Sequence, residues 1–207
     1  MMITKVKICG ITNYEDAAAA MHLGADLLGF NFCRASPRYV APAQAAGIIN
    51  KLPAFVDVAG VFVNSPLEEI REIASQCRLD WIQLHGDESS EFCRWLAYDS
   101  VKTMKALRIK DTADLEQVNR YYTDAILLDA YDPARYGGTG VTFDWNIIGH
   151  IGRRIFLAGG VNPSNAAAAV ELGVYGIDVC SGVESAPGKK DHKKMKALFD
   201  SIRHLRA

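Results

Sequence analysis

The stretch KVKICGITN, residues 5–13, sets the pattern that decides the fold. Its first part, residues 5–9, is a short run typical of a strand, and Gly10 then opens a turn ahead of a helix start. Short apolar runs alternate with helical patterns in the same way along the rest of the chain. Strands are predicted at residues 5–9, 27–32, 57–62, 81–84, 102–106, 125–129, 155–158 and 176–179.

The segments between these runs carry signals of helix starts and stops. Side-chain oxygens that can cap a helix N-terminus occur at Asn13, Ser65, Ser89, Thr112 and Asn162. Gly24 and Gly173 follow helical patterns, at positions where glycine can take the left-handed conformation that ends a helix. A last amphipathic helix is predicted from about residue 191 to residue 205.

Eight strand-then-helix units predict an α/β fold, a single (β/α)8 TIM barrel domain over residues 1–207. The strands carry Val, Ile and Leu on both faces, as in a parallel sheet covered by helices. A doubly wound open sheet has the same alternation, but with about five or six strands and a glycine fingerprint in its first turn. Here the glycine-rich turns come late, where barrels commonly bind phosphate, so the order of the loops favours the barrel.

Composition narrows the class of protein. The chain of 207 residues is long enough for one buried core, and its formal net charge of −1 gives no footprint for nucleic acid or an anionic membrane. It contains neither an apolar stretch long enough to span a bilayer nor a signal-peptide core, so we expect a cytoplasmic protein without nucleic-acid or membrane partners. Its five cysteines are scattered and form no Cys-x-x-Cys pair, which argues against disulfides and a zinc site.

Three late loops present small residues that predict phosphate binding. They are Gly138 after the sixth strand, Gly159 and Gly160 after the seventh, and Ser181 and Gly182 after the eighth. Glycine lets main-chain N–H groups approach an anion closely, and helix N-termini add favourable partial charge. One such loop alone is also explained by turn geometry, but three adjacent loops favour a small-molecule phosphorylated substrate.

Two titratable side chains end strands at the same end of the predicted barrel. Cys9 closes the first strand and Asp129 closes the sixth. A cysteine is more often a buried, inert hydrophobe than a catalyst, but a second titratable strand tip indicates one shared site. In an eight-stranded ring the two would face each other and can act as base and acid on a bound sugar phosphate, with no metal or redox cofactor.

A cysteine base needs help, because a free thiol has a pKa of about 8.5 and is mostly protonated at neutral pH. Strand alternation places Lys7 on the same face as Cys9, one layer below it inside the barrel. A buried lysine requires a carboxylate partner. Our hypothesis is that Lys7 pairs with Asp178 from the neighbouring eighth strand and keeps positive potential near Cys9.

Seven motifs, in this order along the chain, resemble phosphoribosylanthranilate isomerase. They are KICGIT (7–12), SPRY (36–39), QLHGDE (83–88), LLD (127–129), GGTG (137–140), LAGG (157–160) and DVCSGVE (178–184). The resemblance implies an Amadori rearrangement in tryptophan biosynthesis that converts N-(5-phosphoribosyl)anthranilate to 1-(2-carboxyphenylamino)-1-deoxyribulose 5-phosphate. It implies no cofactor.

The resemblance also implies roles for individual residues. Asp129 would be the general acid that protonates the furanose ring oxygen, and Cys9 the general base that removes the C2 proton. Arg38 would hold the anthranilate carboxylate, a role that suits its planar donor fork. His85 would lie near the substrate and Asp178 would face the ribose hydroxyls, although a solvated Arg38 and a purely structural His85 remain alternatives.

The chain departs from the family pattern in small ways, and two other functions stay open. Cys180 stands where serine is frequent in this family. A barrel isomerase of histidine biosynthesis performs the same rearrangement, but such enzymes place an aspartate where Cys9 stands. A non-catalytic sugar-phosphate binding module would keep the glycine loops without needing Cys9 and Asp129 together. Monomer and homodimer are equally compatible with the sequence.

Overall fold

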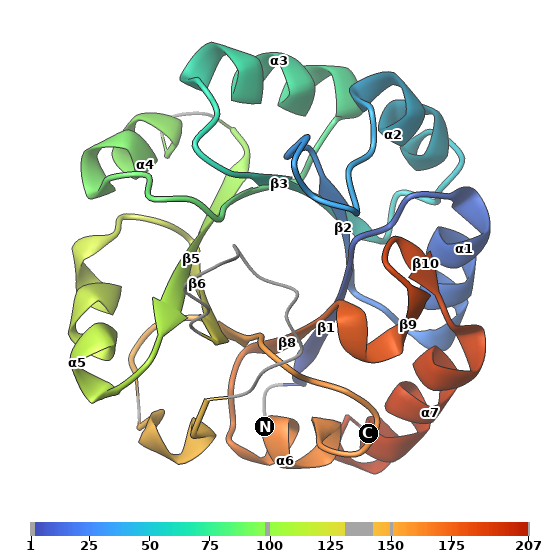
Figure 1. Cartoon of the computed structure of the whole chain (residues 1–207), viewed down its shortest axis with the longest axis vertical. Coiled ribbons are helices and arrows are strands. Elements are labelled where there is room, and N and C mark those ends of the chain that lie inside the picture. The colour runs from blue at the N-terminus through green and yellow to red at the C-terminus, as the bar shows by residue number, and fades with distance from the viewer. Residues whose placement is uncertain (1–2, 98–99, 131–142, 150, 207) are drawn as a thin grey trace.

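The computed structural model describes residues 3–97, 100–130, 143–149 and 151–206. Within these ranges, eight parallel strands pair in chain order and close into a barrel, which confirms the predicted (β/α)8 TIM barrel (Figure 1). The strands are β1 (Lys5–Cys9), β2 (Leu27–Asn31), β3 (Asp57–Phe62), β4 (Trp81–Leu84), β5 (Lys102–Ile109), β6 (Ala125–Ala130), β7 (Ile155–Leu157) and β8 (Gly176–Val179).

Helices surround this ring of strands (Figure 1). They are α1 (Tyr14–Leu23), α2 (Pro42–Ile49), α3 (Leu67–Cys77), α4 (Ser90–Leu96), α5 (Thr112–Leu115), α6 (Ala166–Glu171) and α7 (His192–Ile202), with 3-10 turns at Glu116–Arg120, Trp145–Ile147, Ser181–Val183 and Arg203–Leu205. A small hairpin that the sequence did not predict follows β8, formed by β9 (Glu184–Ala186) and β10 (Lys189–Lys190).

Several predicted helix ends are confirmed. Asn13 caps α1 by accepting a hydrogen bond from the Asp16 N–H, and Ser89 caps α4 in the same way. Gly24 ends α1 with a φ of 106°, and Gly173 follows α6 with a φ of 72°, both in the left-handed region that favours glycine. The last helix ends in a 3-10 turn that reaches Leu205.

Two predicted caps are wrong by one residue. Pro66, not Ser65, precedes α3, and no side chain caps that helix. Asp111, not Thr112, caps α5, because its carboxylate accepts from the Ala113 N–H while Thr112 is already helical. In both places two neighbouring residues carry signals of a helix start, and the sequence pattern does not decide which of the two is the cap.

The remaining boundaries shift for local reasons. Asn162 does not cap α6; its Oδ1 accepts from the Ser164 N–H at 2.9 Å and builds a turn ahead of the helix, which begins at Ala166. β2 and β7 end one residue earlier than predicted, β6 continues one residue further, and β5 continues to Ile109. The extension of β5 pairs with β6, where Arg108 lies opposite Asp129.

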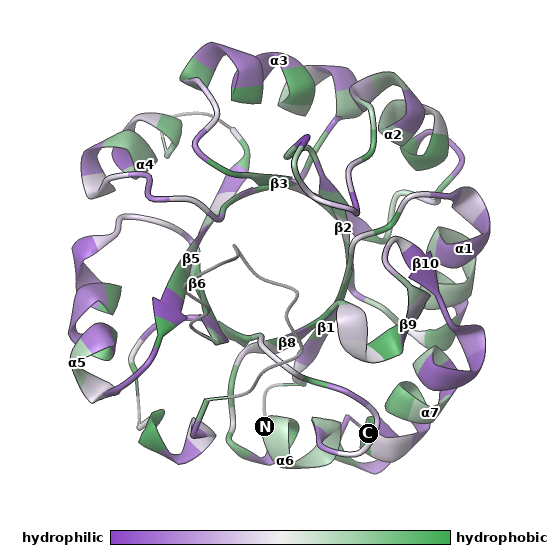
Figure 2. Ribbon diagram, viewed as in Figure 1, coloured by the Kyte–Doolittle hydropathy of each residue, from purple (hydrophilic) through white to green (hydrophobic). Residues whose placement is uncertain are grey.

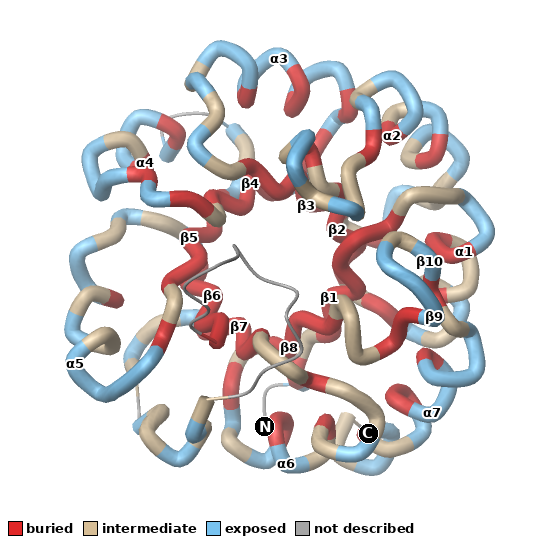
Figure 3. Tube along the Cα trace, in the orientation of Figure 1, coloured by how far each residue is buried: buried red, intermediate tan, exposed pale blue. Residues whose placement is uncertain are grey.

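Two apolar layers follow from strand alternation. One lies between strands and helices and includes Val6 and Ile8 of β1; the other fills the barrel and includes Leu127 and Phe156. The strands are buried on both faces, whereas the outer faces of the helices are exposed and hydrophilic (Figures 2 and 3). Lys7 alternates with Val6 and Ile8 and is completely buried.

Candidate active site

Cys9 ends β1 above a buried ion pair. The Nζ of Lys7 lies 3.0 Å from the Oδ1 of Asp178. The register between β1 and β8 places these two residues directly opposite each other. The pairing expected from the sequence is confirmed, and it compensates the cost of burying the ammonium group inside the barrel.

Gly29 of β2 provides the space for both inward-facing side chains. A Cβ atom at this position would lie 2.8 Å from the Cys9 Sγ and 3.1 Å from the Lys7 Nζ. A larger residue would therefore push the thiol and the ammonium group out of place. Gly29 was not among the predicted site residues, although a glycine inside an apolar strand is a signal of close approach.

The charges around Cys9 favour its thiolate. A hydrogen bond from Cys180 and the nearby ammonium groups of Lys7 and Lys190 hold the pKa of Cys9 well below its usual range, although burial acts in the opposite direction. Burial would lower the pKa of Lys7, but Asp178 and Cys9 hold it above its ordinary value. Burial raises the pKa of Asp178 to about 7, with Lys7 opposing this shift.

Asp129, in β6, accepts hydrogen bonds on both carboxylate oxygens. Its Oδ1 accepts from the Ala130 N–H at 2.9 Å, and its Oδ2 lies 3.2 Å from the Nε2 of His85. The Nδ1 of His85 lies 2.8 Å from the Nε2 of Gln83. Because the Gln83 amide donates to Nδ1, a neutral imidazole carries its proton on Nε2 and donates to Asp129. His85 therefore orients the carboxyl group.

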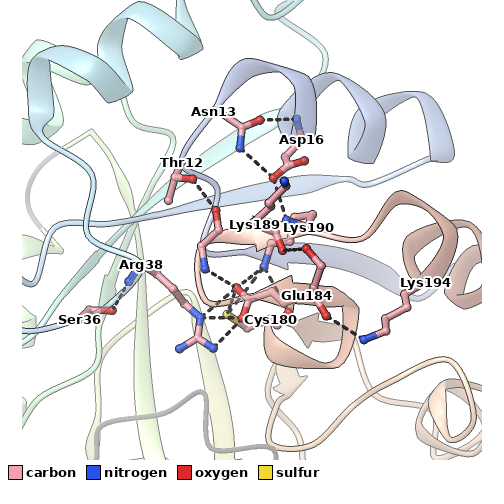
Figure 4. Close-up of polar contacts among 12 residues, drawn as sticks. Thr12, Asn13, Asp16, Ser36, Arg38, Cys180, Glu184, Lys189, Lys190 and Lys194 are labelled. Atoms are coloured by element: carbon pink, nitrogen blue, oxygen red, sulfur yellow. Dashed lines mark hydrogen bonds and ion pairs between the residues drawn. The ribbon is translucent and has the colours of Figure 1, made fainter.

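Arg38 lies in the loop after β2 and contacts Glu184 of β9. Its Nη2 lies 2.7 Å from one carboxylate oxygen and its Nε lies 3.0 Å from the other, which makes a bidentate pair (Figure 4). The Nζ of Lys190 lies 3.0 Å from the same carboxylate. Burial would raise the pKa of Glu184, but the hydrogen bonds from Arg38 and Lys190 hold it below its ordinary value.

Glu184 and Lys190 lie at the candidate site but were not among the residues predicted from the sequence. Glu184 is only 7% exposed and Lys190 only 3% exposed, so both charges are buried. Their contact depends on the hairpin of β9 and β10, whose turn contains Gly188 with a φ of 78°. The Pro-Gly pair at residues 187–188 was the available signal for this turn.

The glycine loop after β7 lies directly against Asp129. Gly159 and Gly160 have φ values of 78° and 67°, which only glycine adopts easily. A Cβ on Gly159 would lie 2.7 Å from the backbone nitrogen of Ala130 and 3.1 Å from the Oδ1 of Asp129. The loop after β7 therefore contacts Asp129 and also contains two of the predicted phosphate-binding residues, Gly159 and Gly160.

The loop after β8 touches the loop after β7. Ser181 and Gly182 lie in the 3-10 turn after this strand, and a Cβ on Gly182 would lie 2.0 Å from the carbonyl oxygen of Val161. Four of the five predicted phosphate-binding residues are thus located on two contacting loops. The fifth, Gly138, lies outside the described residues.

The described ranges contain no group of three or more His, Cys, Asp or Glu side chains arranged to hold a metal ion. In the same ranges, no helix is both long and apolar enough to cross a membrane. The site combines a thiol favoured as thiolate, an oriented carboxyl group, an arginine fork and glycine-rich loops. These groups suit proton transfer on an anionic sugar phosphate.

Comparisons with known proteins cover nearly the whole chain. A family model described as N-(5'phosphoribosyl)anthranilate (PRA) isomerase matches residues 6–201. The chain is 49% identical over 206 residues to the N-(5'-phosphoribosyl)anthranilate isomerase of Pelobacter propionicus, covering 98% of this chain and 97% of that protein.

Solved structures give the same result. The crystal structure of phosphoribosyl anthranilate isomerase from Thermus thermophilus superposes with a TM-score of 0.90 at 38% identity, covering 98% of this chain and 100% of that one. Another phosphoribosyl anthranilate isomerase, in complex with reduced 1-(o-carboxyphenylamino)-1-deoxyribulose 5-phosphate, superposes with a TM-score of 0.84 at 38% identity and the same coverage.

Proposed function

Because the chain belongs to the N-(5'-phosphoribosyl)anthranilate isomerase family, we propose that it catalyses the Amadori rearrangement of N-(5-phosphoribosyl)anthranilate to 1-(2-carboxyphenylamino)-1-deoxyribulose 5-phosphate in tryptophan biosynthesis. The observation that carries the proposed mechanism is the position of Cys9 at a strand end, above the buried pair of Lys7 and Asp178. This arrangement supports a thiolate base inside a barrel of this family.

In the proposed reaction, Asp129 acts first as the general acid. Its proton goes to the furanose ring oxygen while the anilino nitrogen lone pair forms a C=N bond and the bond from C1 to the ring oxygen breaks. The hydrogen bond from His85 supports this role, because it fixes the orientation of the carboxyl group. The product of this step is an open-chain Schiff base.

Cys9 then acts as the general base. Its thiolate takes the proton from C2, and the electrons of that bond form an enolamine that tautomerises to the amino ketose. The surroundings of Cys9, with Cys180 and the Lys7 ammonium group as causes, lower its pKa and so favour the thiolate that this step needs. Proton transfer of this kind contributes about 10²- to 10⁴-fold to a rate.

Binding roles complete the proposal. Arg38 would hold the anthranilate carboxylate, and its bidentate contact with Glu184 supports this by fixing the guanidinium plane. Asp178 would contact the ribose hydroxyls. Main-chain N–H groups near Gly138, Gly159, Gly160, Ser181 and Gly182 would bind the phosphate.

We expect the purified protein to consume freshly prepared N-(5-phosphoribosyl)anthranilate with loss of its fluorescence, and not to rearrange the ribonucleotide of histidine biosynthesis. The second substrate is the matched control, because it requires the same chemistry with a different base. Tight binding of a reduced product analogue without turnover of either substrate would instead support a sugar-phosphate binding module.

We expect the Lys7→Met substitution to move the acid limb of the pH profile of kcat/KM upward by about one pH unit or more. Removing the ammonium group raises the pKa of Cys9, so a higher pH is needed to form the thiolate. Lys5→Met is the matched control. The Lys5 side chain lies on the same face of β1 as that of Lys7, but it is partly exposed and pairs with Asp26.

The Lys7→Met experiment includes circular dichroism and thermal melting, since breaking a buried ion pair costs about 3–5 kcal/mol. A folded Lys7→Met protein with an unchanged acid limb and normal turnover would contradict the tuning role.

A further inference from the structure

We propose that Lys105 and Glu88 are positioning residues of the active site, which fix the backbone on both sides of His85 and so hold its imidazole against the carboxyl group of Asp129. This inference deepens the proposed function and rests on it for its kinetic consequence. It assigns a role to a buried ion pair that the proposed reaction does not itself use.

The ion pair lies outside the barrel interior, beside the loop after β4. Met104 and Ala106 of β5 fill the barrel, so Lys105 between them points to the outer face of that strand. β4 is the neighbouring strand, and Leu84 lies opposite Lys105 in the register (Figure 3). The Nζ of Lys105 lies 3.0 Å from the Oε2 of Glu88, and both residues are buried.

The peptide group before His85 is fixed by Lys105 and by β3. The Leu84 carbonyl accepts a hydrogen bond from the Lys105 Nζ at 3.3 Å. The His85 N–H, which belongs to the same peptide unit, donates to the Phe62 carbonyl at 2.8 Å. Because a peptide unit is planar, these two contacts set its orientation from both neighbouring strands.

The peptide groups after His85 depend on the same ion pair. The Gly86 N–H donates to the Oε2 of Glu88 at 2.9 Å, and the Gly86 carbonyl accepts from the Lys105 Nζ at 2.7 Å. The two peptide units that meet at the His85 Cα are therefore both bonded to the pair, one through its carbonyl and the other through its N–H. This fixes the backbone dihedral angles of His85 and the direction in which its side chain leaves the backbone.

Glu88 also ties the loop after β4 to the end of β3. Its Oε1 accepts from the Asn64 N–H at 2.8 Å, and the Asn64 Oδ1 accepts from the Asp87 N–H at 2.7 Å. A Cβ atom on Gly86 would overlap the Asn64 Oδ1, so the loop packs closely against this residue. The Glu88 carboxylate is thus the common acceptor of contacts from β3, from β5 and from its own loop.

Stability alone does not account for this ion pair. The outer face of β5 contacts a layer of apolar side chains, where replacing a buried ion pair by apolar residues of similar size is often neutral or stabilising. An apolar residue at position 105 cannot bond the Leu84 and Gly86 carbonyls. What the charged pair supplies, and an apolar pair does not, is the conformation of the loop that carries His85.

This conformation bears on the reaction through the contact between His85 and Asp129. The Nε2 of His85 lies 3.2 Å from the Oδ2 of Asp129, at the limit of a hydrogen bond, so a small movement of the loop breaks it. A misplacement of about 1 Å can lower a rate by about 100-fold. Lys105 and Glu88 thus act through His85, without contacting the reacting atoms.

The first test follows the His85 ring by NMR in protein labelled with ¹⁵N-histidine, with the His85 signals assigned by their loss in His85→Ala. In the unmodified protein we expect a proton on Nε2 that exchanges slowly with water, because it donates to Asp129. Lys105→Met is expected to abolish this signal. Methionine fills the space of the lysine stem but donates no hydrogen bond to the loop.

Arg153→Met is the matched control. The Arg153 guanidinium also donates to three backbone carbonyls, those of Val118, Tyr121 and Thr123, which precede β6 at the end remote from the site. Its removal therefore loosens a loop in the same way at another place. We expect the His85 signal to persist in this variant and kcat to stay within about two-fold.

Turnover of phosphoribosylanthranilate supplies the second test. We expect Lys105→Met to lower kcat by about 10- to 100-fold, while KM stays within about three-fold. In a His85→Ala background the same substitution lowers kcat by less than about two-fold, because the contact through which it acts is already absent. A purely structural role would lower kcat by the same factor in both backgrounds.

If Lys105→Met does not fold, the double variant Lys105→Met/Glu88→Gln takes its place in both tests, since it leaves no buried charge unpaired. The inference is overturned if the unmodified protein shows no protected Nε2 proton, or if the folded variant retains this proton. It is also overturned if kcat falls by the same factor in both backgrounds, or not at all. The NMR measurement needs no turnover, so a protein that fails to isomerise phosphoribosylanthranilate contradicts the proposed function and leaves this result readable.

Discussion

The Cys9→Ser substitution lowers kcat for phosphoribosylanthranilate isomerisation by about 10²- to 10⁴-fold, the range expected for loss of a general base. A serine hydroxyl has nearly the size of the thiol, but it does not ionise at the pH where Cys9 forms a thiolate. Lys7 keeps its ion pair with Asp178 beside position 9, so the fold and KM change little. Stopped-flow or steady-state fluorescence of the substrate measures the loss.

Cys93→Ser is the control for this experiment. Cys93 is fully buried in α4, and burial raises its pKa to about 11, so its thiol stays protonated. We expect kcat to stay within about two-fold in this variant, because no proton transfer depends on it. Comparable turnover in Cys9→Ser and Cys93→Ser would remove Cys9 from the mechanism.

Asp129→Asn has an effect of similar size, a fall in kcat of about 10²- to 10⁴-fold, because an amide cannot give up a proton to the ring oxygen. The decrease of activity at high pH also disappears, since no proton then has to remain on residue 129. The amide oxygen can still accept a hydrogen bond from the Ala130 N–H, and the amide has nearly the size of the carboxyl group, so the variant is expected to fold. A pH series of single-turnover rates separates the chemical step from product release.

Asp124→Asn is the matched control. Asp124 directly precedes β6, at the opposite end of that strand from Asp129. The Oδ2 of Asp124 accepts a hydrogen bond from the Thr103 N–H at 2.8 Å, on the side of the barrel that serves stability. This substitution is expected to lower the melting temperature slightly and to leave kcat within about two-fold. A high-pH limb that persists unchanged in Asp129→Asn, with near-normal kcat, would assign the acid role to another group.

Much of the barrel follows from local pattern. Each strand is a short, nearly continuous apolar run, and the turns between strands and helices carry capping residues and glycines that act over a few residues. The interior position of Lys7 and its pairing with Asp178 were also predictable. Strand alternation determines that Lys7 lies on the inner face of the first strand. In a closed ring the first and last strands are neighbours, which places Lys7 next to Asp178.

The parts that could not be predicted depend on contacts between distant segments. Arg38 and Glu184 are separated by 146 residues, and Glu184 belongs to the hairpin of β9 and β10, which contacts the start of α1 through the hydrogen bond from the Lys190 N–H to Asp16. His85 and Asp129 are 44 residues apart, and their contact depends on how the ends of β4 and β6 face each other. The helix starts at Pro66 and Asp111 differ from the prediction for a local reason, since neighbouring residues offered similar signals.

The pairing of β1 with β8 closes the barrel, and it also determines when during synthesis the contacts of the active site can form. Lys7 and Asp178 are 171 residues apart, and Cys9 and Cys180 lie just beyond them on the same two strands. A nascent chain that lacks β8 has an unpaired β1 edge, and its Lys7 ammonium group lacks the carboxylate of Asp178. Contacts of such long sequence separation form late in folding. The acidity of Cys9 is thus acquired only when synthesis has delivered the last quarter of the barrel.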